Sequence, residues 1–304
     1  MRKVYDKKIA VILVNYNGKS YNKKCIESIL NSTICEIITI VVVDNASTDG
    51  SAEELRKNWG ENKQVHLIWL DNNYGFSKGN NEGIKWALEQ GYEYFLLLNN
   101  DTEIAPDAIE RLLDCQKETG GIVVPKILYA DRPEIIWYAG GKFSKVIKKP
   151  VQIGLNQRDT GQYNRRQRCD FANGCCMLFS RRIVQILGYL HEKFFLYYED
   201  TEYSFRAKER DVPIWYCADA IIYHKVNGST KGNEKPVNAY YITRNWLMCN
   251  RMHMNKRFFL FIGYFIINRI VWISIWMIQK KWKMVGAVLS GIEDYINGKD
   301  NLRR

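Results

Sequence analysis

Four runs of apolar residues recur at regular intervals in the first third of the chain. The runs IAVILV, ITIVVV, VHLIWL and EYFLLL end at Val14, Val43, Leu70 and Leu98, which are 29, 27 and 28 residues apart. These intervals match a βαβ unit of roughly 30 residues, and continuous apolar strands are typical of a parallel sheet covered on both faces. Between them, SAEELRKNW and NNEGIKWALEQG, which ends at Gly91, have helical patterns. The sequence therefore predicts an α/β fold with a doubly wound, mainly parallel sheet and helices on both faces.

Amide and carboxylate side chains follow each of these strands. They are Asn15 and Asn17, then Asp44 and Asn45, then Asp71, Asn72 and Asn73, and finally Asn99, Asn100 and Asp101. Parallel strands of an open sheet end on the same edge, where ligands of such folds bind. Asn and Asp are also ordinary turn residues, but four clusters on one edge favour a binding site for a polar ligand.

The end of the chain has a different hydrophobic pattern. Phe258 to Ile278 is an apolar run of 21 residues, long enough to cross a bilayer. Asn268 and Arg269 lie at its midpoint, where a charge costs about 2.5–3.5 kcal/mol. Lysines, arginines and tryptophans flank the run, as at membrane interfaces. We predict an in-plane or shallowly inserted helix, with residues 256–283 on a membrane surface. A membrane span and a helical hairpin buried in a dimer interface are the alternatives.

The positive charge is concentrated in two places. The 304 residues carry a formal net charge of +11, of which residues 141–168 and 251–304 contribute +7 each, so the remainder is negative. Such regions can bind nucleic acid or an anionic membrane, or form a solvated surface. The apolar run beside the second region favours the membrane, so we expect no nucleic acid as a partner.

The cysteines and the missing motifs disfavour several classes of protein. None of the eight cysteines forms a CxxC pair or a zinc-binding spacing, so reduced thiols in the cytoplasm are expected. The N-terminus lacks the pattern of a secretory signal. NYNG stands where a dinucleotide-binding G-x-G-x-x-G would follow the first strand, and neither a Walker-type phosphate loop nor a G-x-S-x-G elbow occurs.

Five motifs in order along the chain give it a likeness to a known family. VNYNG, VVVDNASTDGS, NNYGFSKGNNEG, LLLNND and FFLYYEDTEYSFR lie between about residues 9 and 206, and Arg244-Asn245 extends the likeness. The chain resembles family 2 glycosyltransferases with the GT-A fold, above all the rhamnosyltransferase-like members that build bacterial surface polysaccharides. The resemblance implies an inverting transfer of a sugar, with rhamnose as a candidate, from a dTDP- or UDP-linked donor. The acceptor would be a hydroxyl of a saccharide or polyprenyl-linked molecule at the cytoplasmic face of the membrane.

The resemblance assigns the nucleotide to the loops after the first strands. In VNYNG, Asn15, Tyr16 and Asn17 would lie beside the base. In VVVDNAS, Asp44 would accept a hydrogen bond from the ring N–H of uracil or thymine. An Asx-turn is the alternative role for Asp44.

The glycine-rich motif NNYGFSKGNNEG would complete the nucleotide site. Asn73 belongs to its first part, and Gly75 and Gly79 would let the backbone approach the ligand. Asn80 and Asn81 would begin a helix whose positive end faces the nucleotide or sugar. A glycine-rich loop followed by a helix cap is the alternative.

LLLNND aligns with the metal-binding signature of the family, with Asp101 as its one acidic residue. Asp101 would bind a divalent cation, Mg²⁺ or Mn²⁺, that bridges the donor phosphates. Asn99 and Asn100 depart from the acidic pattern, but Mg²⁺ needs only one or two carboxylates besides phosphate and water; we expect Asn100 in the nucleotide site. His224 matches the position of a third ligand and would suit Mn²⁺ better. An ordinary satisfied histidine is the alternative.

The motif FFLYYEDTEYSFR would supply the catalytic base. Inversion requires a carboxylate that removes the proton of the acceptor hydroxyl as it attacks. The resemblance favours Asp200 as this base, with Glu199 shaping the acceptor site. A role for Asp200 as cap of the following helix competes with this assignment. Arg206 would either anchor that helix through a carboxylate or reach a phosphate.

The segment CDFANGCCMLFSRR would line the sugar pocket, with Asn173 and Gly174 nearest, while the following Cys175–Leu178 would pack in the core. We expect a glycosyltransferase domain over residues 1–250, with a nucleotide-binding half (1–105) and an acceptor half (106–250), and a membrane-associating tail over 251–304. One alternative is a nucleotidyltransferase that makes sugar nucleotides, but this chain lacks the glycine- and arginine-rich phosphate loop expected of that class. The other is a non-catalytic module that binds sugar nucleotides. A homo-oligomer is compatible with the tail.

Overall fold

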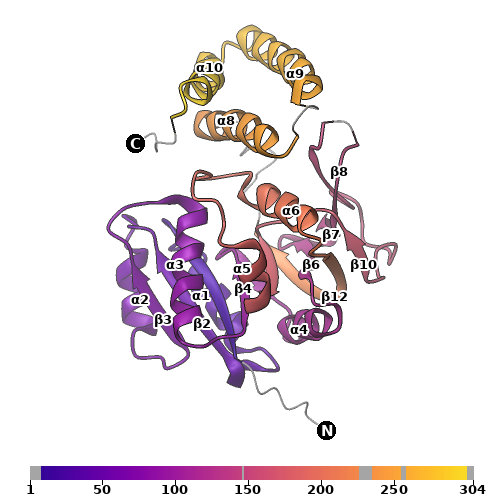
Figure 1. Ribbon diagram of the computed structural model, residues 1–304. Helices are drawn as coiled ribbons and strands as arrows, with labels where there is room; N and C mark the ends of the chain where they lie inside the picture. Colours follow the sequence, from indigo (N-terminus) through magenta and orange to yellow (C-terminus); the bar gives the residue numbers. More distant parts are fainter. Residues whose placement is uncertain (1–7, 146, 226–234, 255–257, 300–304) are drawn as a thin grey trace.

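The computed structural model describes residues 8–145, 147–225, 235–254 and 258–299. A ten-stranded sheet forms its centre, and a two-stranded sheet of β8 and β9 lies apart from it (Figure 1). The strands are β1 Ile9–Asn15, β2 Ile38–Asp44, β3 Val65–Trp69, β4 Tyr94–Leu98, β5 Thr102–Ile104, β6 Ile122–Tyr129, β7 Arg132–Tyr138, β8 Gly141–Phe143, β9 Pro150–Gln152, β10 Gln167–Cys169, β11 Cys176–Ser180 and β12 Ile214–His224. The helices are α1 Asn22–Leu30, α2 Ser51–Trp59, α3 Gly75–Glu89, α4 Ala108–Thr119, α5 Arg181–Leu187, α6 Glu199–Glu209, α8 Pro236–His253, α9 Phe258–Ile278 and α10 Trp282–Ile296, with a short 3-10 turn at Cys35–Ile37.

The four predicted strands are confirmed as β1 to β4, and they pair in parallel in the order β4-β1-β2-β3. Asn15 lies opposite Asp44, and Asp44 lies opposite Trp69. The carboxyl ends of these strands therefore share one edge, as predicted. Because β1, β2 and β4 are buried on both faces, their sequences are continuously apolar.

The second half of the chain extends the same sheet and makes it mixed. β11 runs antiparallel to β4 and to β6, whereas β12 runs parallel to β6. β5, β7 and β10 add antiparallel pairs. Parallel pairing therefore dominates the N-terminal half only. Helices cover both faces of the sheet, as predicted (Figure 1).

The predicted start of the third helix is wrong. α3 begins at Gly75, so Asn80 and Asn81 lie in its second turn, where both are buried. The amide N–H of Phe76 in the first turn donates to the carbonyl of Phe195 at 2.8 Å. The positive end of this helix therefore faces the segment around Phe195. Asn81 donates from Nδ2 to the carbonyl of Leu190 at 2.9 Å and joins the same part of the chain.

The tail forms two helices, α9 and α10, that lie with α8 beyond the end of the sheet (Figure 1). α10 crosses α8 closely at Gly291, where an added Cβ would lie 2.8 Å from the carbonyl oxygen of Tyr240. α9 contacts both α8 and α10. Among the described helices, α9 is the one long and apolar enough to cross a membrane by length and composition, and 11 % of its most apolar window is buried.

Candidate active site

Asn15 organises the loops at the ends of β1, β2 and β4. Its side chain is fully buried. Its Nδ2 donates to Oδ1 of Asp44 at 2.6 Å and to Oγ of Ser51 at 2.9 Å. Its Oδ1 accepts from Nδ2 of Asn22 at 2.8 Å and from Nδ2 of Asn100 at 3.2 Å. The structure thus brings Asn15, Asp44 and Asn100 together, and their mutual hydrogen bonds fix the shape of the predicted nucleotide site.

The carboxylate of Asp44 forms the Asx-turn that was its alternative predicted role. Oδ2 accepts the backbone N–H of Ser47 at 3.0 Å. A carboxylate can accept about four hydrogen bonds, so this turn and the bond from Asn15 leave capacity for a base. Asn17 has a φ of 55° and accepts the N–H of Thr48 at 2.8 Å, while Tyr16 beside it is 50 % exposed. Contact of these residues with a base stays a prediction.

Gly75 and Gly79 allow α3 to pack closely on its neighbours. Gly75 has a φ of +82°, and a Cβ there would lie 2.3 Å from the carbonyl oxygen of Phe195. A Cβ at Gly79 would lie 2.9 Å from Val14 at the end of β1. Asn73 fixes the start of the helix, because its Oδ1 accepts the N–H of Gly75 at 3.0 Å. The close approaches that the structure shows are therefore to protein, and contact of Asn73, Gly75 or Gly79 with the nucleotide stays a prediction.

Gly75→Ala should lower the free energy of unfolding by more than 2 kcal/mol, the range of a strained backbone together with a forced steric overlap. Gly91→Ala is the matched control, because Gly91 also has a positive φ of +79° but nothing lies within 4 Å of its added Cβ. We expect that control to lose only about 1 kcal/mol. Urea unfolding of the two variants measures the difference. Equal losses of unfolding free energy would show that the overlap of the added Cβ with Phe195 does not destabilise the protein.

Asp101 and His224 lie side by side at the edge of the sheet. Oδ1 of Asp101 is 3.1 Å from Nε2 of His224. The approach lacks hydrogen-bond geometry, so this buried oxygen has no hydrogen-bond partner among the described residues. Burial opposes the charge of His224, but Cys175 and Asp101 outweigh it and raise the pKa of the imidazole to about 10. A cation bound to Nε2 would therefore have to displace a proton from it.

This pair fits a divalent cation held partly by its substrate. Two neighbouring ligands at about 2.1 Å from an octahedral ion lie roughly 3 Å apart, which is the separation of these two atoms. Within the described part of the chain, no group of three or more His, Cys, Asp or Glu side chains could hold a metal ion. Asp101 and His224 would therefore need diphosphate oxygens and water to complete the shell, which is the usual arrangement for Mg²⁺ with nucleotides.

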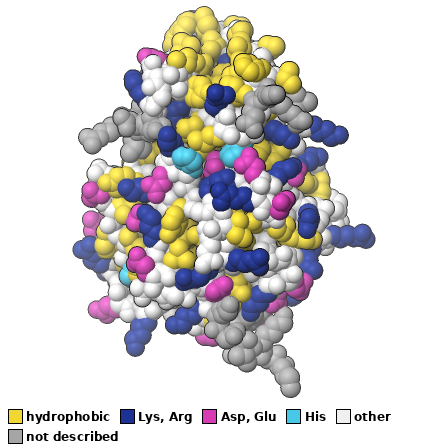
Figure 2. All heavy atoms as spheres, viewed as in Figure 1, with side chains coloured by type: hydrophobic (Ala, Val, Ile, Leu, Met, Phe, Trp, Pro, Cys, Tyr) yellow, Lys and Arg dark blue, Asp and Glu magenta, His cyan; other side chains and the backbone are white. Residues whose placement is uncertain are grey.

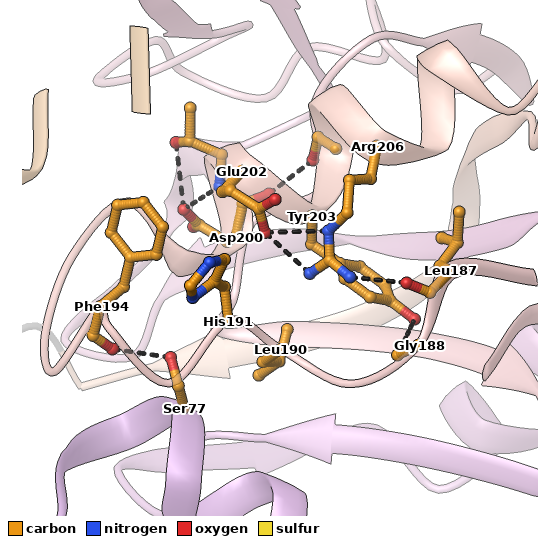
Figure 3. Close-up of polar contacts among 12 residues, drawn as sticks. Ser77, Leu187, Gly188, Leu190, His191, Phe194, Asp200, Glu202, Tyr203 and Arg206 are labelled. Atoms are coloured by element: carbon orange, nitrogen blue, oxygen red, sulfur yellow. Dashed lines mark hydrogen bonds and ion pairs between the residues drawn. The ribbon is translucent and has the colours of Figure 1, made fainter. Parts of the chain in front are cut away.

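The segment from Phe194 to Tyr198 leads to Asp200, the predicted catalytic base. Ser77 of α3 donates from Oγ to the carbonyl of Phe194 at 2.7 Å (Figure 3). Tyr197 and Tyr198 both have left-handed backbone conformations, with φ of 67° and 74°. Such strain persists only where surrounding contacts fix it, and it is common at active sites.

The carboxylate of Asp200 is fixed by backbone amides. Oδ2 accepts the N–H of Gly174 at 3.0 Å, and Oδ1 accepts the N–H of Thr201 at 2.6 Å. α6 begins at Glu199 after Tyr198, so Asp200 lies in the first turn and is not the cap residue. The residue after Gly174 is Cys175, whose carbonyl accepts the N–H of Asn99, two residues before Asp101, at 2.9 Å. The segment Gly174–Cys175 therefore connects the predicted base with the strand end that carries Asp101.

Glu199 and Asp200 are two adjacent carboxyl groups in different surroundings. Burial, and then repulsion by Asp200, hold the pKa of Glu199 well above its usual value. Its Oε2 is buried and has no hydrogen-bond partner in the described structure. Burial also raises the pKa of Asp200, but the N–H groups of Gly174 and Thr201 oppose this. The environment therefore favours a protonated Glu199 beside an ionised Asp200.

Arg206 forms an ion pair within its own helix. Its Nε and Nη2 donate to Oε2 of Glu202 at 3.0 and 2.7 Å, and its Nη1 donates to the carbonyl of Leu187 at 2.6 Å (Figure 3). The ion pair with Glu202 lies within α6, and the carbonyl of Leu187 at the end of α5 is what anchors the helix. The predicted anchor through a carboxylate is therefore wrong. The core prediction for the CCML segment is confirmed, because Cys175, Cys176, Met177 and Leu178 are all buried.

We expect the free energy of unfolding to depend on pH through His253. Burial opposes its charge, but hydrogen bonds with Glu202 and Glu209 outweigh burial and raise its pKa. The stabilisation is therefore complete below about pH 6.5, the ordinary value, and is lost as pH rises through the higher folded-state pKa. Urea unfolding should show His253→Gln about 1 kcal/mol less stable than wild type near pH 6, with a smaller gap near pH 9. A gap that widens with pH would contradict this.

Two supporting residues on α8 received no role in the sequence analysis. Asn245 donates from Nδ2 to the carbonyls of Leu196 and Tyr197, each at 2.9 Å. Arg244 donates from Nη2 to the carbonyl of Lys193 at 3.0 Å. Both therefore hold the segment before Asp200. The dipeptide Arg244-Asn245 was noticed as part of the family likeness, but its partners are backbone carbonyls, which leave no side-chain pattern in the sequence.

Known proteins resemble this chain along most of its length. It is 28 % identical over 297 residues to the low-salt glycan biosynthesis hexosyltransferase Agl10 of Haloferax volcanii, covering 95 % of this chain and 87 % of that protein. It is 24 % identical over 254 residues to the dTDP-rhamnosyl transferase RfbF of Shigella flexneri, covering 81 % of each.

The fold is that of GT-A glycosyltransferases. The structure of GalNAc-T7 with UDP, GalNAc and Mn²⁺ superposes with a TM-score of 0.63 at 17 % identity, over 81 % of this chain. The chain spans about half of that protein, 48 % of its length, and the likeness concerns the fold. The family model described as glycosyl transferase family 2 matches residues 10–188. Since this match covers more than half of the chain, the protein belongs to glycosyl transferase family 2, as its motifs predicted.

Proposed function

We propose that this glycosyltransferase inverts the anomeric centre of a dTDP- or UDP-linked sugar and needs a divalent cation. The observation that carries the proposal is that the segment Gly174–Cys175 is bonded on one side to Asp200 and on the other to Asn99, beside the pair Asp101 and His224. Asp200 would remove the proton of the acceptor hydroxyl as its oxygen attacks the anomeric carbon. Inversion requires this attack from the face opposite the diphosphate, so base and cation flank the reacting carbon.

The cation would supply electrostatic stabilisation of the nucleoside diphosphate as it leaves. Asp101 and His224 would hold it, with Asp101 offering an oxygen that has no hydrogen-bond donor among the described residues. The pyrimidine base of the nucleotide would lie against the loops that Asn15 joins, where Asp44 would accept a hydrogen bond from the ring N–H. The name of the relative RfbF supports dTDP-rhamnose as a donor to test first, and the name of Agl10 supports a glycan as the product.

Thermal unfolding with UDP or dTDP, each with and without Mn²⁺, tests the donor site. We expect stabilisation that requires nucleotide and metal together, because the cation completes its shell with the diphosphate. Stabilisation by nucleotide alone, to the same extent, would remove the metal from the proposal. An absence of any shift would favour a module that does not bind these donors.

We also propose that α9 and α10 rest on the cytoplasmic face of an anionic membrane, where a polyprenyl-linked acceptor would lie. Hydrophobic side chains gather over these two helices (Figure 2). The large apolar side chains that are exposed on them are Phe259, Leu260, Tyr264, Ile266, Ile267, Ile270, Val271, Trp272, Met277, Ile278, Trp282, Leu289 and Ile296. Lys280 and Lys281 lie in the turn between the helices, and Lys283 lies in the first turn of α10. The predicted flanking residues Lys256 and Arg257 lie outside the described residues.

The position of Arg269 supports an in-plane helix over a membrane span. Its Nη1 donates to Oγ1 of Thr243 on α8 at 3.0 Å, and its guanidinium lies 5.4 Å from the ring centre of Trp246. The charge at the middle of α9 therefore faces the protein, and the opposite face stays apolar. A span would have to break these contacts and place the charge in hydrocarbon, at a cost of about 2.5–3.5 kcal/mol.

Sedimentation with vesicles tests the membrane proposal. Wild type should bind phosphatidylglycerol vesicles more tightly than phosphatidylcholine vesicles. Replacing Lys280, Lys281 and Lys283 by Gln should weaken binding to the anionic vesicles by at least tenfold, since each lysine near the surface contributes about 1 kcal/mol. Protein that stays in the supernatant, or a lipid-free dimer that Ile267→Ser dissociates, would instead make this face an interface between copies of the chain.

A further inference from the structure

A cavity of about 200 Å³ lies between α8 and α10, beside the segment that leads to Asp200. We call it the α8–α10 pocket and define it by Lys193, Arg244, Arg251, Asp294 and Lys299. One water needs only about 10–15 Å³ of such space, so the pocket can hold a small solvated ion. It is separate from the donor edge, because none of the predicted nucleotide or metal residues lines it.

Arg244 is a buried cation without an anionic partner. Its side chain is 2 % exposed. Its Nε donates to Oδ1 of Asn245 and its Nη2 to the carbonyl of Lys193, and both acceptors are neutral. Its Nη1 has no hydrogen-bond partner, and no carboxylate of the described residues forms an ion pair with it. The rings of Tyr240 and Tyr241 lie 5.6 and 5.3 Å from the guanidinium and compensate part of its charge. A bound anion would compensate the rest and so stabilise the protein.

The other charged groups of the pocket leave it with an excess of positive charge. Asp294 is the one carboxylate among the described residues that line it. Oδ2 of Asp294 accepts the hydroxyl of Tyr240 at 2.9 Å, and its Oδ1 lies 3.5 Å from Nζ of Lys299. The guanidinium of Arg251 contacts the ring of Phe258, at 5.4 Å from its centre, and none of the described carboxylates forms an ion pair with it. Among the described residues, the lining of the pocket thus has four cationic side chains and one carboxylate.

We propose that the α8–α10 pocket binds a phosphate group. Two arginines suit phosphate because the planar guanidinium donates parallel hydrogen bonds to its oxygens, and lysines add charge. The phosphate could be a free ion or belong to a lipid, since α10 and α9 form the exposed apolar face. The site goes beyond the proposed function, because it requires neither the donor nor the cation. A phosphate here would also act on the segment before Asp200, to which Arg244 and its neighbour Asn245 are bonded.

Calorimetric titration of the full chain with inorganic phosphate, in EDTA and at constant ionic strength, tests this site. Arg244→Met would expose carbonyls that Arg244 now holds and could unfold the segment, so we choose the exposed rim instead. Arg251→Gln with Lys299→Gln should weaken phosphate binding by tenfold or more. Lys57→Gln with Lys63→Gln removes the same charge from exposed positions elsewhere and should leave binding unchanged. An absence of saturable binding, or equal affinity in all three proteins, would overturn the proposal.

Soluble dihexanoyl phosphatidic acid identifies the source of the phosphate. If it displaces inorganic phosphate from wild type and binds at least tenfold more tightly, the pocket takes a lipid phosphate. If inorganic phosphate binds and the lipid does not displace it, the pocket takes the free ion. Binding of UDP with Mn²⁺, measured on the same variants, should be unchanged. Its loss in wild type would count against the proposed function and leave the phosphate result intact.

Discussion

Asp200→Asn should lower kcat by 10²- to 10⁴-fold, the usual contribution of a general base, while nucleotide binding with Mn²⁺ stays near that of wild type. The reason is that Asp200 is the carboxylate whose charge is supported by two backbone N–H groups, from Gly174 and Thr201. The asparagine retains the shape of the side chain but cannot accept a proton. Steady-state kinetics with the donor that the nucleotide panel selects measures the loss.

Glu199→Gln is the matched control for this prediction. Burial favours the protonated form of Glu199, so its amide should reproduce much of its shape and polarity, and the loss in kcat should be well below that of Asp200→Asn. The pH profile gives an independent check. Because burial raises the pKa of Asp200, the acid limb of kcat/KM should lie above the ordinary aspartate value of about 3.9. A larger effect at Glu199 than at Asp200 would reverse the two roles.

Asp101→Ala should lower kcat/KM by about 10³-fold or more, which corresponds to roughly 4 kcal/mol of transition-state stabilisation. Asp101 provides the one carboxylate of the predicted cation site, so the variant should also lose the dependence of nucleotide binding on Mn²⁺. Asp131→Ala removes an exposed carboxylate that only approaches Arg132 at 3.9 Å, and it should behave as wild type. If Asp101→Ala folds normally and transfers sugar at the wild-type rate, the metal assignment is wrong.

The first half of the sheet could be predicted because its signal is local. β1, β2 and β4 are buried on both faces, so their apolar runs mark their ends to within one residue. The start of α3 could not be predicted, because its glycines resemble a loop. Gly79 and Gly83 are needed because an added Cβ would lie 2.9 Å from Val14 and 2.5 Å from Ile12. These glycines are therefore explained by the tight packing of the helix on β1 and not by a flexible loop.

The second half of the sheet depends on contacts that no local pattern records. β12 pairs with β6 about 90 residues away, and β11 enters between β6 and β4 in the antiparallel direction. The inward direction of Arg269 is similar. The sequence shows a charge in the middle of an apolar run, but its partner Thr243 lies on α8, so only the structure reveals that the outer face of α9 is uncharged.

In the candidate active site, the motifs identified the predicted site residues but not the contacts between them. The likeness placed Asp101 and His224 in one site, and the structure brings them to 3.1 Å. Contact of Asn15 with the nucleotide base stays a prediction, and the sequence did not indicate that its buried amide joins three loops. Asn245 was missed because it acts on backbone carbonyls. Supporting contacts of this kind follow from three-dimensional packing and have no spacing rule along the chain.

The anomeric configuration of the first product tests the central claim most directly. Wild-type protein would be incubated with Mn²⁺ and the dTDP- or UDP-sugar that the nucleotide panel favours, and proton NMR would record the sugar released or transferred before mutarotation. The account predicts a product with the anomeric configuration opposite to that of the donor, formed by wild type and not by Asp200→Asn. A product with the donor's configuration, or one formed equally well by both proteins, would contradict a single displacement assisted by Asp200.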